Sequence, residues 1–338
     1  MTDSALKVSD LRVSFRTDGG LVRAVRGVNF ELASGEILAI VGESGSGKSA
    51  TAMALTALNR SSNASIEGSV NFGGRELLSA SEDELRKIRG AEIAMIFQDP
   101  MTSLTPVHSV GDLIAEVLRA HEPLSGDEAD ERAVELLSAV GISDAKERSK
   151  NYPHEFSGGM RQRVMIAMAL ACHPAVLIAD EPTTALDVTI QAQILRLIRR
   201  MRSEVDASVL LITHDLGVVA EVADRVAVMY AGRIVEQGST SEVFSNPQHP
   251  YTLGLLASVP RTDRPRSKLL TTIPGQPIAM TSDDIGCAFA ARCASAFEKC
   301  RDRPNLLACS DAGSHLAACW LSDEQRTKLR SEVDDGAA

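Results

Sequence analysis

Several features are scarce or missing in this 338-residue chain, and each absence narrows its possible roles. The longest apolar candidate for a membrane span, 165–179, is interrupted by His173 and Pro174. It is also shorter than the ~20 apolar residues that a spanning helix needs. The first residues, Met-Thr-Asp-Ser, lack the basic and apolar regions of a signal peptide. We therefore expect the chain to be cytoplasmic. Separate subunits would supply the membrane-spanning part of any membrane complex.

Basic residues are fewer than acidic ones. The chain has 35 Lys and Arg and 45 Asp and Glu, which gives a formal net charge of −10. Proteins that bind DNA or RNA usually carry a basic face, so this balance argues against a nucleic-acid partner. The hydrophobic content of 44% is ordinary for a globular protein. The length suits one large domain, or one domain with a small appendage.

Strand and helix signals alternate through most of the chain. Apolar or β-branched stretches predict strands at 6–15, 24–32, 37–41, 176–179, 209–213 and 226–229. Helices are expected at 48–58, within 107–170 and at 189–201, and capping boxes mark helix starts at 125–128 and 239–242. This alternation predicts an α/β fold with a mostly parallel sheet covered by helices.

A phosphate-binding pattern follows the strand expected at 37–41. Gly42-Glu43-Ser44-Gly45-Ser46-Gly47-Lys48-Ser49 fits G-x-x-x-x-G-K-[ST] and lies between a strand and a helix. Its glycines let backbone N–H groups point at phosphate oxygens, and the helix N-terminus adds partial positive charge. Lys48 would reach the β- and γ-phosphates, and the Ser49 hydroxyl would bind Mg²⁺. A Gly/Ser-rich turn without a ligand is the alternative, but the context favours a nucleotide site built from Gly42, Ser44, Gly45, Ser46, Gly47, Lys48, Ser49 and Ala50.

Two acids end the strand expected at 176–179. In P-loop enzymes an acid at this place holds Mg²⁺, here Asp180, and the adjacent Glu181 is placed to polarise the attacking water. Taken alone, two acids after a strand are more often a helix cap or a solvated turn. The choice between these interpretations depends on the rest of the sequence.

Four further motifs accompany the loop and the two acids. They are Gln98 in Ile96-Phe97-Gln98-Asp99-Pro100, the stretch Phe156-Ser157-Gly158-Gly159-Met160-Arg161-Gln162, the triplet Ala185-Leu186-Asp187, and His214 in Ile212-Thr213-His214-Asp215. Through them the sequence resembles the ATP-binding cassette (ABC) family over about 250 residues. They match its Q-loop, signature motif, D-loop and switch histidine. A loop glutamine, a Gly-Gly turn or a core histidine would explain each motif singly, but not all of them together.

The resemblance implies a role for each residue of one half-site. Glu181, His214, Lys48 and Gln98 would be catalytic, with His214 bridging the γ-phosphate and Glu181. Ser49, Gln98 and Asp180 would hold Mg²⁺.

The resemblance also implies residues that hold the rest of ATP. Phe15 would stack on adenine, with Val25 packing nearby. Ser157 and Gly159, at a helix start, would form an anion site that faces the ATP of the opposite subunit. Met160 stands where many cassettes have glutamine, which leaves that anion site unaltered. ATP would thus be sandwiched between two ATPase chains.

The implied architecture is a P-loop NTPase ABC cassette with a RecA-like core, an antiparallel β subdomain and a helical subdomain. We expect the cassette at 5–260, with the helical subdomain at about 101–170, and a small Cys-rich extension at 261–330. The polar stretch 261–268 is typical of a linker, and residues 331–338 are expected to be disordered.

Several stretches are similar to one subfamily, the ATPases of oligopeptide/dipeptide (peptide/nickel) importers. They are 41–49, 97–104, 180–189 and 246–252, with one departure at Thr105, where the subfamily usually has asparagine. The resemblance implies an ATPase that powers import of di- or oligopeptides from the cytoplasmic face of the cell membrane. Its partners would be two transmembrane permease subunits, an extracytoplasmic substrate-binding protein and a second ATPase, which we expect to be a paralogue. Import of nickel or glutathione stays open, because other subunits select the substrate.

Five of the six cysteines fall near the C-terminus, and four of them have the spacing C-x5-C-x6-C-x18-C. In a reducing compartment such a cluster favours a metal site over disulfides. The extension resembles that of the subfamily, which implies a [4Fe–4S] cluster on Cys287, Cys293, Cys300 and Cys319. Zinc and metal-free thiols remain alternatives to the [4Fe–4S] cluster. Two tasks for the cysteine site also stay open: a folding staple, which we favour, and redox sensing. Cys309 would be spare, and Cys172 would be a buried helix residue.

Two other classes of protein fit the sequence less well. A soluble ABC protein of translation or DNA repair would carry two cassettes or long coiled-coil or zinc insertions, and the chain has neither. A P-loop GTPase would need a guanine-reading motif such as N-K-x-D, and a kinase would need a site for its phosphate acceptor. The sequence favours the transporter ATPase.

Overall fold

The computed structural model describes residues 4–184, 186–205, 207–259, 272–278, 286–309 and 313–334. The chain divides into two compact units. The first unit holds Met1–Lys7, Glu31–Ile37 and Asn71–Ile212, and the second holds Val8–Phe30, Leu38–Val70 and Thr213–Ala338. The linker predicted at 261–268 lies outside the described residues. Within the described residues, no helix is both long and apolar enough to cross a membrane.

Three parallel strands form the sheet of the first unit. They lie in the order β6-β7-β8 and span Ile93–Ile96, Val176–Asp180 and Ser208–Thr213. Every residue of β7 and β8 is buried, as expected for parallel strands with both faces covered. The strands predicted at 176–179 and 209–213 are therefore confirmed, and Asp180 ends β7.

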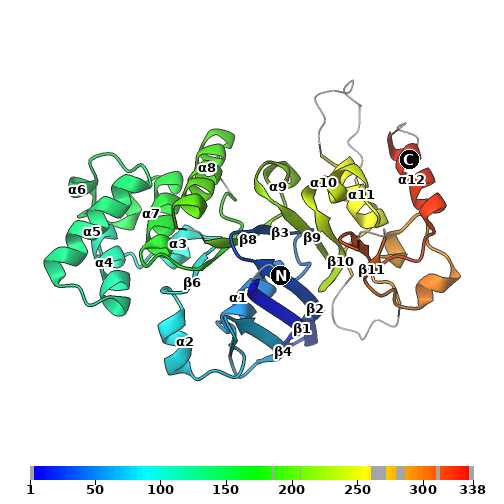
Figure 1. Ribbon diagram of the computed structural model, residues 1–338, viewed down its shortest axis with the longest axis horizontal. Helices are drawn as coiled ribbons and strands as arrows, with labels where there is room; N and C mark the ends of the chain where they lie inside the picture. The colour runs from blue at the N-terminus through cyan, green and yellow to red at the C-terminus, as the bar shows by residue number, and fades with distance from the viewer. Residues whose placement is uncertain are drawn as a thin grey trace. The chain divides into compact units, whose positions relative to one another are not determined.

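Helices make up most of the remaining first unit (Figure 1). Ser125 accepts the Glu128 N–H at 3.3 Å, and the Glu128 carboxylate accepts the Ser125 N–H at 2.9 Å. This reciprocal pair is the predicted capping box, and it starts α5. The helices are α2 (Glu82–Ile88), α3 (Pro100–Ser103), α4 (Val110–His121), α5 (Gly126–Ala139), α6 (Ala145–Arg148), η1 (Pro153–Glu155), α7 (Gly158–Leu170) and α8 (Val188–Val205).

A second sheet region belongs to the second unit. β3 (Ile37–Val41) is parallel to β9 (Arg225–Tyr230), and β10 (Arg233–Ser239), β12 (Leu316–Ala317) and β11 (Leu307–Ala308) continue it in antiparallel fashion. The last two strands come from the Cys-rich extension. The helices of this unit are α1 (Lys48–Leu55), α9 (Leu216–Val222), α10 (Thr240–Ser245), α11 (Pro250–Ala257), η2 (Ala290–Arg292), η3 (Glu298–Arg301) and α12 (Asp323–Asp334).

Long antiparallel strands form the other layer. β1 (Ser4–Thr17), β2 (Gly20–Ala33) and β4 (Ala64–Phe72) lie in the order β2-β1-β4 and run mainly through the second unit. A short β5 (Arg75–Glu76) pairs with the end of β4 in the first unit. The strands predicted at 6–15 and 24–32 fall within β1 and β2, which matches the expected antiparallel β subdomain.

An aromatic cluster fixes the extension to the cassette within the second unit. The ring of Phe289 meets that of Tyr230 edge-on, with centroids 5.3 Å apart, and lies 5.4 Å from that of Tyr251. All three side chains are buried in one core cluster with residues of β3, β9 and α9. The extension is thus part of the second unit's core rather than a loosely attached tail.

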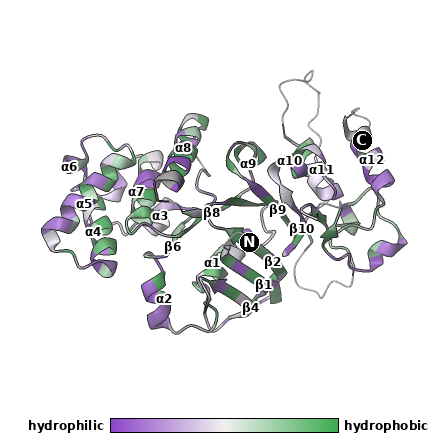
Figure 2. Cartoon of the chain, in the orientation of Figure 1, coloured by the Kyte–Doolittle hydropathy of each residue, from purple (hydrophilic) through white to green (hydrophobic). Residues whose placement is uncertain are grey.

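Two predictions about local structure are wrong. Residues 331–334 belong to α12, whereas the sequence analysis expected disorder over 331–338; residues 335–338 lie outside the described part. Figure 2 shows α12 as largely hydrophilic, so its apolar signal is weak. Cys172 was expected within a helix, but it lies in the turn after α7 and is half-buried.

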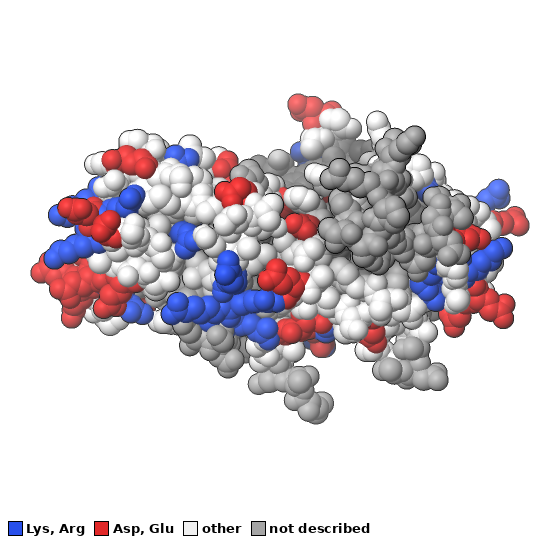
Figure 3. Space-filling view, turned by 90° about the horizontal axis from the view of Figure 1, so that it is seen from above, with Lys and Arg blue, Asp and Glu red and all other residues white. Residues whose placement is uncertain are grey.

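Both signs of charge occupy the face drawn in Figure 3, where Lys and Arg side chains also gather into a band. In the first unit, α8 carries Arg196, Arg199 and Arg200. Arg163, Arg196 and Arg200 line an open groove of about 360 Å³ between α7 and α8. A chain with a net charge of −10 therefore still has a local basic surface.

Candidate nucleotide site

The phosphate loop, Gly42–Ser49, connects β3 to α1 as predicted, and α1 begins at Lys48. A Cβ atom on Gly42 would lie 2.2 Å from the Met229 carbonyl oxygen. Gly47 has φ of 105°, and a Cβ there would lie 2.2 Å from the Ala24 carbonyl oxygen. Side chains at these two positions would force the loop to move, so its shape depends on glycine.

The polar groups of this loop are arranged around an exposed tip at Ser44 and Gly45. Lys48 is buried, and its Nζ donates to the carbonyl oxygens of Gly42 at 2.8 Å and Glu43 at 3.0 Å. The buried Ser46 Oγ has no hydrogen-bond partner among the described residues. An ammonium folded over the loop and an unsatisfied hydroxyl are groups that a phosphate chain would satisfy. Ser49 and Ala50 follow in the first turn of α1.

Two other predicted catalytic residues, Gln98 and Glu181, come together at the end of β7 in the first unit. Gln98 Nε2 donates to Glu181 Oε2 at 3.0 Å, and Thr184 Oγ1 donates to the same oxygen at 2.8 Å. The Glu181 backbone N–H donates to the Ile212 carbonyl at 2.8 Å. The carboxylate is therefore held in place by two side-chain donors. Thr184 is a member of this group that the sequence analysis did not identify.

Glu181 also has an unusual backbone, with φ of 46° in the left-handed region. A non-glycine residue there costs about 1–3 kcal/mol, and such strain gathers at functional sites. Asp180, the last residue of β7, is only 3% exposed. A buried acid beside a strained, hydrogen-bonded acid fits the predicted division between Mg²⁺ binding and water activation.

The remaining predicted residues are placed on their expected elements. His214 is exposed and directly follows β8. Phe15 is half-buried on β1, whereas Val25 on β2 is only 2% exposed and therefore packs in the core. Lys48, Ser49 and His214 belong to the second unit, and Gln98, Asp180 and Glu181 to the first.

The stretch predicted as a signature motif begins a helix. Ser157 is the N-cap of α7, and its Oγ accepts the Met160 N–H at 3.4 Å. Ser157 and Gly158 are exposed, so the helix N-terminus is open to a ligand. A Cβ on Gly159 would lie 2.7 Å from Ile190 Cγ2 of α8, which explains the need for glycine there. In the predicted D-loop, Ala185 lies outside the described residues, and Asp187 accepts the Ile190 N–H at the start of α8.

Comparisons with known proteins decide the family. Residues 25–184 match the ABC transporter family, and residues 235–300 match the oligopeptide/dipeptide transporter C-terminal region. The dipeptide transport ATP-binding protein DppD of Bacillus subtilis is 53% identical over 96% of this chain and 96% of its own. The chain belongs to the ABC transporter family. Within that family it is also 53% identical to the oligopeptide transport ATP-binding protein OppD of Salmonella typhimurium, over 95% of this chain and 94% of that one.

Solved structures agree on the fold of this ABC protein. MJ0796, described as a bacterial ABC transporter cassette of dimeric structure, has a TM-score of 0.63 and 29% identity, covering 70% of this chain and 98% of that one. The cbiO1 protein of Clostridium perfringens gives a TM-score of 0.60 at 31% identity, covering 72% and 91%. The predicted ABC cassette fold is confirmed.

The C-terminal part of this ABC protein contacts the phosphate loop. The Glu43 N–H donates to Tyr251 Oη at 2.8 Å, and the Glu43 carboxylate pairs with Arg292 of the extension. Tyr251 belongs to the stretch 246–252 that the sequence analysis noted as typical of the subfamily. The pairing of Glu43 with Arg292 was not predicted, although Glu43 lies in the phosphate-loop motif and Arg292 directly precedes Cys293.

The four predicted cluster cysteines lie around one small cavity, which Cys287, Cys293, Cys300 and Cys319 line together. Burial raises the pKa of Cys293 to about 11, and neighbouring thiols add to the shift. Nevertheless, no group of three or more His, Cys, Asp or Glu side chains within the described residues could hold a metal ion. The expected [4Fe–4S] site is therefore not confirmed.

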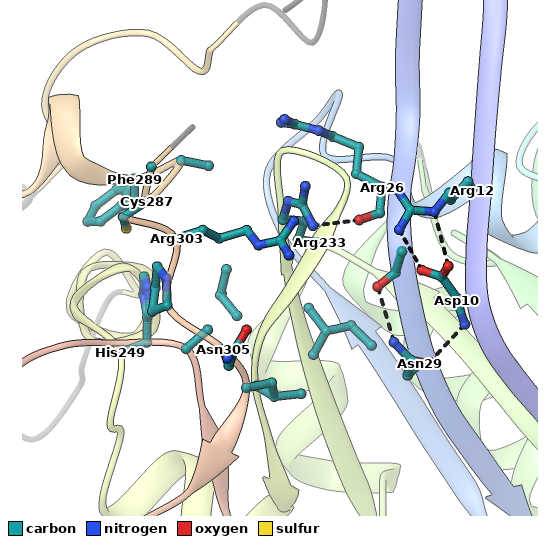
Figure 4. A pocket seen from close by; sticks show the side chains of 18 residues that line it. Asp10, Arg12, Arg26, Asn29, Arg233, His249, Cys287, Phe289, Arg303 and Asn305 are labelled. Carbon is teal, nitrogen blue, oxygen red and sulfur yellow. Dashed lines mark hydrogen bonds and ion pairs between the residues drawn. The ribbon is translucent and has the colours of Figure 1, made fainter. Parts of the chain in front are cut away.

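A larger cavity in the second unit is not the nucleotide site. It has a volume of about 250 Å³ and is lined by arginines of β1, β2, β10 and the extension (Figure 4). Arg12 there pairs with Asp10 at 2.8 Å, and Arg233 donates to the Arg26 carbonyl at 2.6 Å. No residue of the phosphate loop lines it. The Arg233 contact joins β10 to β2, whereas the Arg12–Asp10 pair lies within β1.

Proposed function

We propose that this chain is the ATP-binding and ATP-hydrolysing subunit of an ABC importer for di- or oligopeptides. The observation that carries the proposal is identity above 50% along nearly the whole chain to proteins named for dipeptide and oligopeptide transport. The hydrogen-bonded Gln98–Glu181 pair and the glycine-dependent phosphate loop support the ATPase activity. Nickel or glutathione import is the alternative.

We propose the following chemistry for the site, supported by the resemblance to ABC ATPases and by the local contacts of each residue. Lys48 and the loop N–H groups bind the β- and γ-phosphates, and Phe15 stacks on adenine with Val25 supporting it. Ser49, Gln98 and Asp180 would hold Mg²⁺, and the bound ion would neutralise phosphate charge. Glu181 orients the attacking water and takes its proton, with the carboxylate aimed by Gln98 and Thr184. His214 contacts the γ-phosphate.

A second ATPase chain completes the proposed site. The exposed N-terminus of α7, with Ser157 and Gly159, suits the γ-phosphate of ATP on an opposite subunit. A similar cassette, MJ0796, is described as a dimer in a post-hydrolysis state bound to ADP and Pi. We favour a paralogous partner, and therefore a heterodimer.

The proposed membrane partners are two transmembrane permease subunits and an extracytoplasmic substrate-binding protein. The chain would lie peripherally at the cytoplasmic face of the membrane. The region near α3 exposes large apolar side chains: Met101 is 59% exposed and Val107 is 72% exposed. Such side chains suit a groove for a helix of the permease within residues 101–151.

We also propose that Cys287, Cys293, Cys300 and Cys319 bind a [4Fe–4S] cluster as a folding staple, with zinc and free thiols as alternatives. Supporting this, the four thiols share one cavity, and such a cluster takes one thiolate per iron. Visible absorbance of protein purified without oxygen, with iron and zinc analysis, separates the three cases. A colourless protein with neither metal would contradict the proposal.

The transport function is tested with the assembled complex in sealed vesicles. We expect Mg·ATP to drive accumulation of labelled di- or oligopeptide in the presence of the binding protein, with peptide-stimulated ATP hydrolysis. Labelled nickel and glutathione serve as competing substrates in the same vesicles. Accumulation of either one without peptide transport would contradict the peptide assignment and leave the ATPase assignment intact.

A further inference from the structure

Glu43 is the one acid in the phosphate loop, and a residue far along the chain neutralises it. Arg292 Nη1 lies 2.6 Å from Glu43 Oε2, and Nη2 lies 3.0 Å from Oε1. This is a two-pronged pair with the side chain of Arg292 only 4% exposed. Paired ions of this geometry are stronger and more specific than single contacts. An unpaired Glu43 would instead present a negative charge beside a polyphosphate.

Arg292 is itself fixed by several partners. Its Nε donates to the Pro274 carbonyl at 2.8 Å, and its guanidinium lies over the rings of Tyr230 and Phe289, 5.8 and 5.9 Å from their centroids. Planar stacking together with five fixed donors is specific to arginine, and lysine cannot reproduce it. The guanidinium is therefore a rigid anchor point for the loop.

The anchored acid is coupled to the lysine expected to bind phosphate. The Glu43 N–H donates to Tyr251 Oη, its carboxylate pairs with Arg292, and its carbonyl accepts from Lys48 Nζ at 3.0 Å. Movement of Glu43 would move the carbonyl that holds Lys48. The extension thus helps to set where the Lys48 ammonium lies.

We propose that Arg292 is a positioning residue for nucleotide binding, which holds Glu43 so that the phosphate loop and Lys48 are ready for ATP. The inference rests on the proposed ATPase function. Arg292 ends η2, between Cys287 and Cys293, and the Cys293 N–H donates to the Ala290 carbonyl. The cysteine-bearing segment therefore contacts the phosphate loop directly through the Arg292 side chain.

The test measures Mg·ATP affinity and steady-state hydrolysis with the full chain in its assembled complex. We expect Arg292→Gln to raise the KM and Kd for ATP about tenfold, with kcat changed less than about twofold. Arg292→Lys should give an intermediate shift, because it keeps the charge and loses the fork. Arg301→Gln, an exposed arginine of the same extension, is the matched control and should leave both constants unchanged.

A double-mutant cycle separates positioning from general stability. Once Glu43→Gln has removed the carboxylate, adding Arg292→Gln should raise KM less than it does alone. If the fall in kcat of Arg292→Gln matches the fall in its amount of folded protein, and the variant shows no coupling to Glu43, the role of Arg292 is purely structural. That result would overturn the inference. Unchanged ATP affinity in Arg292→Gln would also overturn it. If the unmodified complex fails to bind Mg·ATP, the proposed function itself fails.

Discussion

The phosphate loop and the end of β7 hold their functional groups in different ways. In the loop, Gly42 and Gly47 leave space that neighbouring backbone carbonyls occupy. The groups that we propose to bind phosphate there are mainly backbone N–H groups. At the end of β7, Gln98 and Thr184 donate hydrogen bonds that orient the carboxylate of Glu181. The first arrangement depends on backbone shape and the second on side-chain chemistry. Changes in the loop should therefore alter affinity, and changes at Glu181 should alter rate.

Glu181→Gln gives the largest expected effect. Gln keeps the size of the side chain and removes the base, so we expect kcat to fall at least about 100-fold while Mg·ATP binding is retained. Single-turnover hydrolysis and nucleotide binding by the assembled complex measure the two quantities. Glu147→Gln, an exposed acid of the same unit, is the control. Hydrolysis at the unmodified rate would remove Glu181 from the mechanism.

Gly47→Ala tests the other side of the comparison. The new Cβ would contact the Ala24 carbonyl in a backbone conformation that alanine avoids, so ATP affinity should fall at least about 50-fold. Gly126→Ala, where a Cβ would meet no atom within 4 Å, should leave affinity unchanged. Equilibrium binding of a labelled ATP analogue measures both variants. Normal affinity in Gly47→Ala would show that the loop adapts.

His249 supports the loop indirectly, because its Nδ1 accepts the N–H of Tyr251 at 3.1 Å. Burial lowers the pKa of His249 to about 4, while Glu236 and Arg326 nearby act in opposite directions. Between about pH 6.5, the normal pKa of histidine, and about pH 4, His249 is therefore protonated in the unfolded chain and neutral in the native protein. The stability from this group is present above that window and is lost as pH falls.

His249→Asn should remove this acid sensitivity and keep an acceptor for the Tyr251 N–H. We expect the unmodified protein to lose about 2 kcal/mol more unfolding free energy than the variant between about pH 7 and about pH 5. Denaturant unfolding at the two pH values measures the difference. Identical pH dependence in both proteins would show that His249 is not the titrating group.

Thr184→Val gives the smallest expected change. It removes one of the two donors to Glu181 at nearly constant shape, and one lost hydrogen bond corresponds to about a fivefold fall in kcat. KM for ATP should hardly move. Thr189→Val, an exposed threonine at the start of α8, is the control. A rise in KM without loss of rate would place Thr184 with the binding groups instead.

The loop, the capping box at Ser125 and strands such as β3 could be predicted because their signals are local. A G-x-x-x-x-G-K-[ST] pattern between a strand and a helix contains the information for its own shape. The same holds for β7, whose apolar run ends at Asp180. The assignment of Gln98 and His214 depended on resemblance, because a lone glutamine or histidine carries no periodic signal.

Other features could not be predicted, because they depend on distant contacts. Arg292 and Glu43 are 249 residues apart in sequence, and nothing near either one specifies the pair. β12 has only two residues and forms because β10 offers its edge at Glu236 and Gln237. Glu181 has a φ of 46°, and no residue preference in the sequence marks this left-handed backbone.

The pairing of β12 with β10 has a practical consequence for anyone shortening this chain. β10 is hydrogen-bonded to β9 on one side and to β12 of the extension on the other. A fragment that stops before residue 300 would leave the second side of β10 open, and a bare strand edge recruits other chains. Fragments limited to the cassette are therefore expected to aggregate on expression, even though they contain every motif of the nucleotide site.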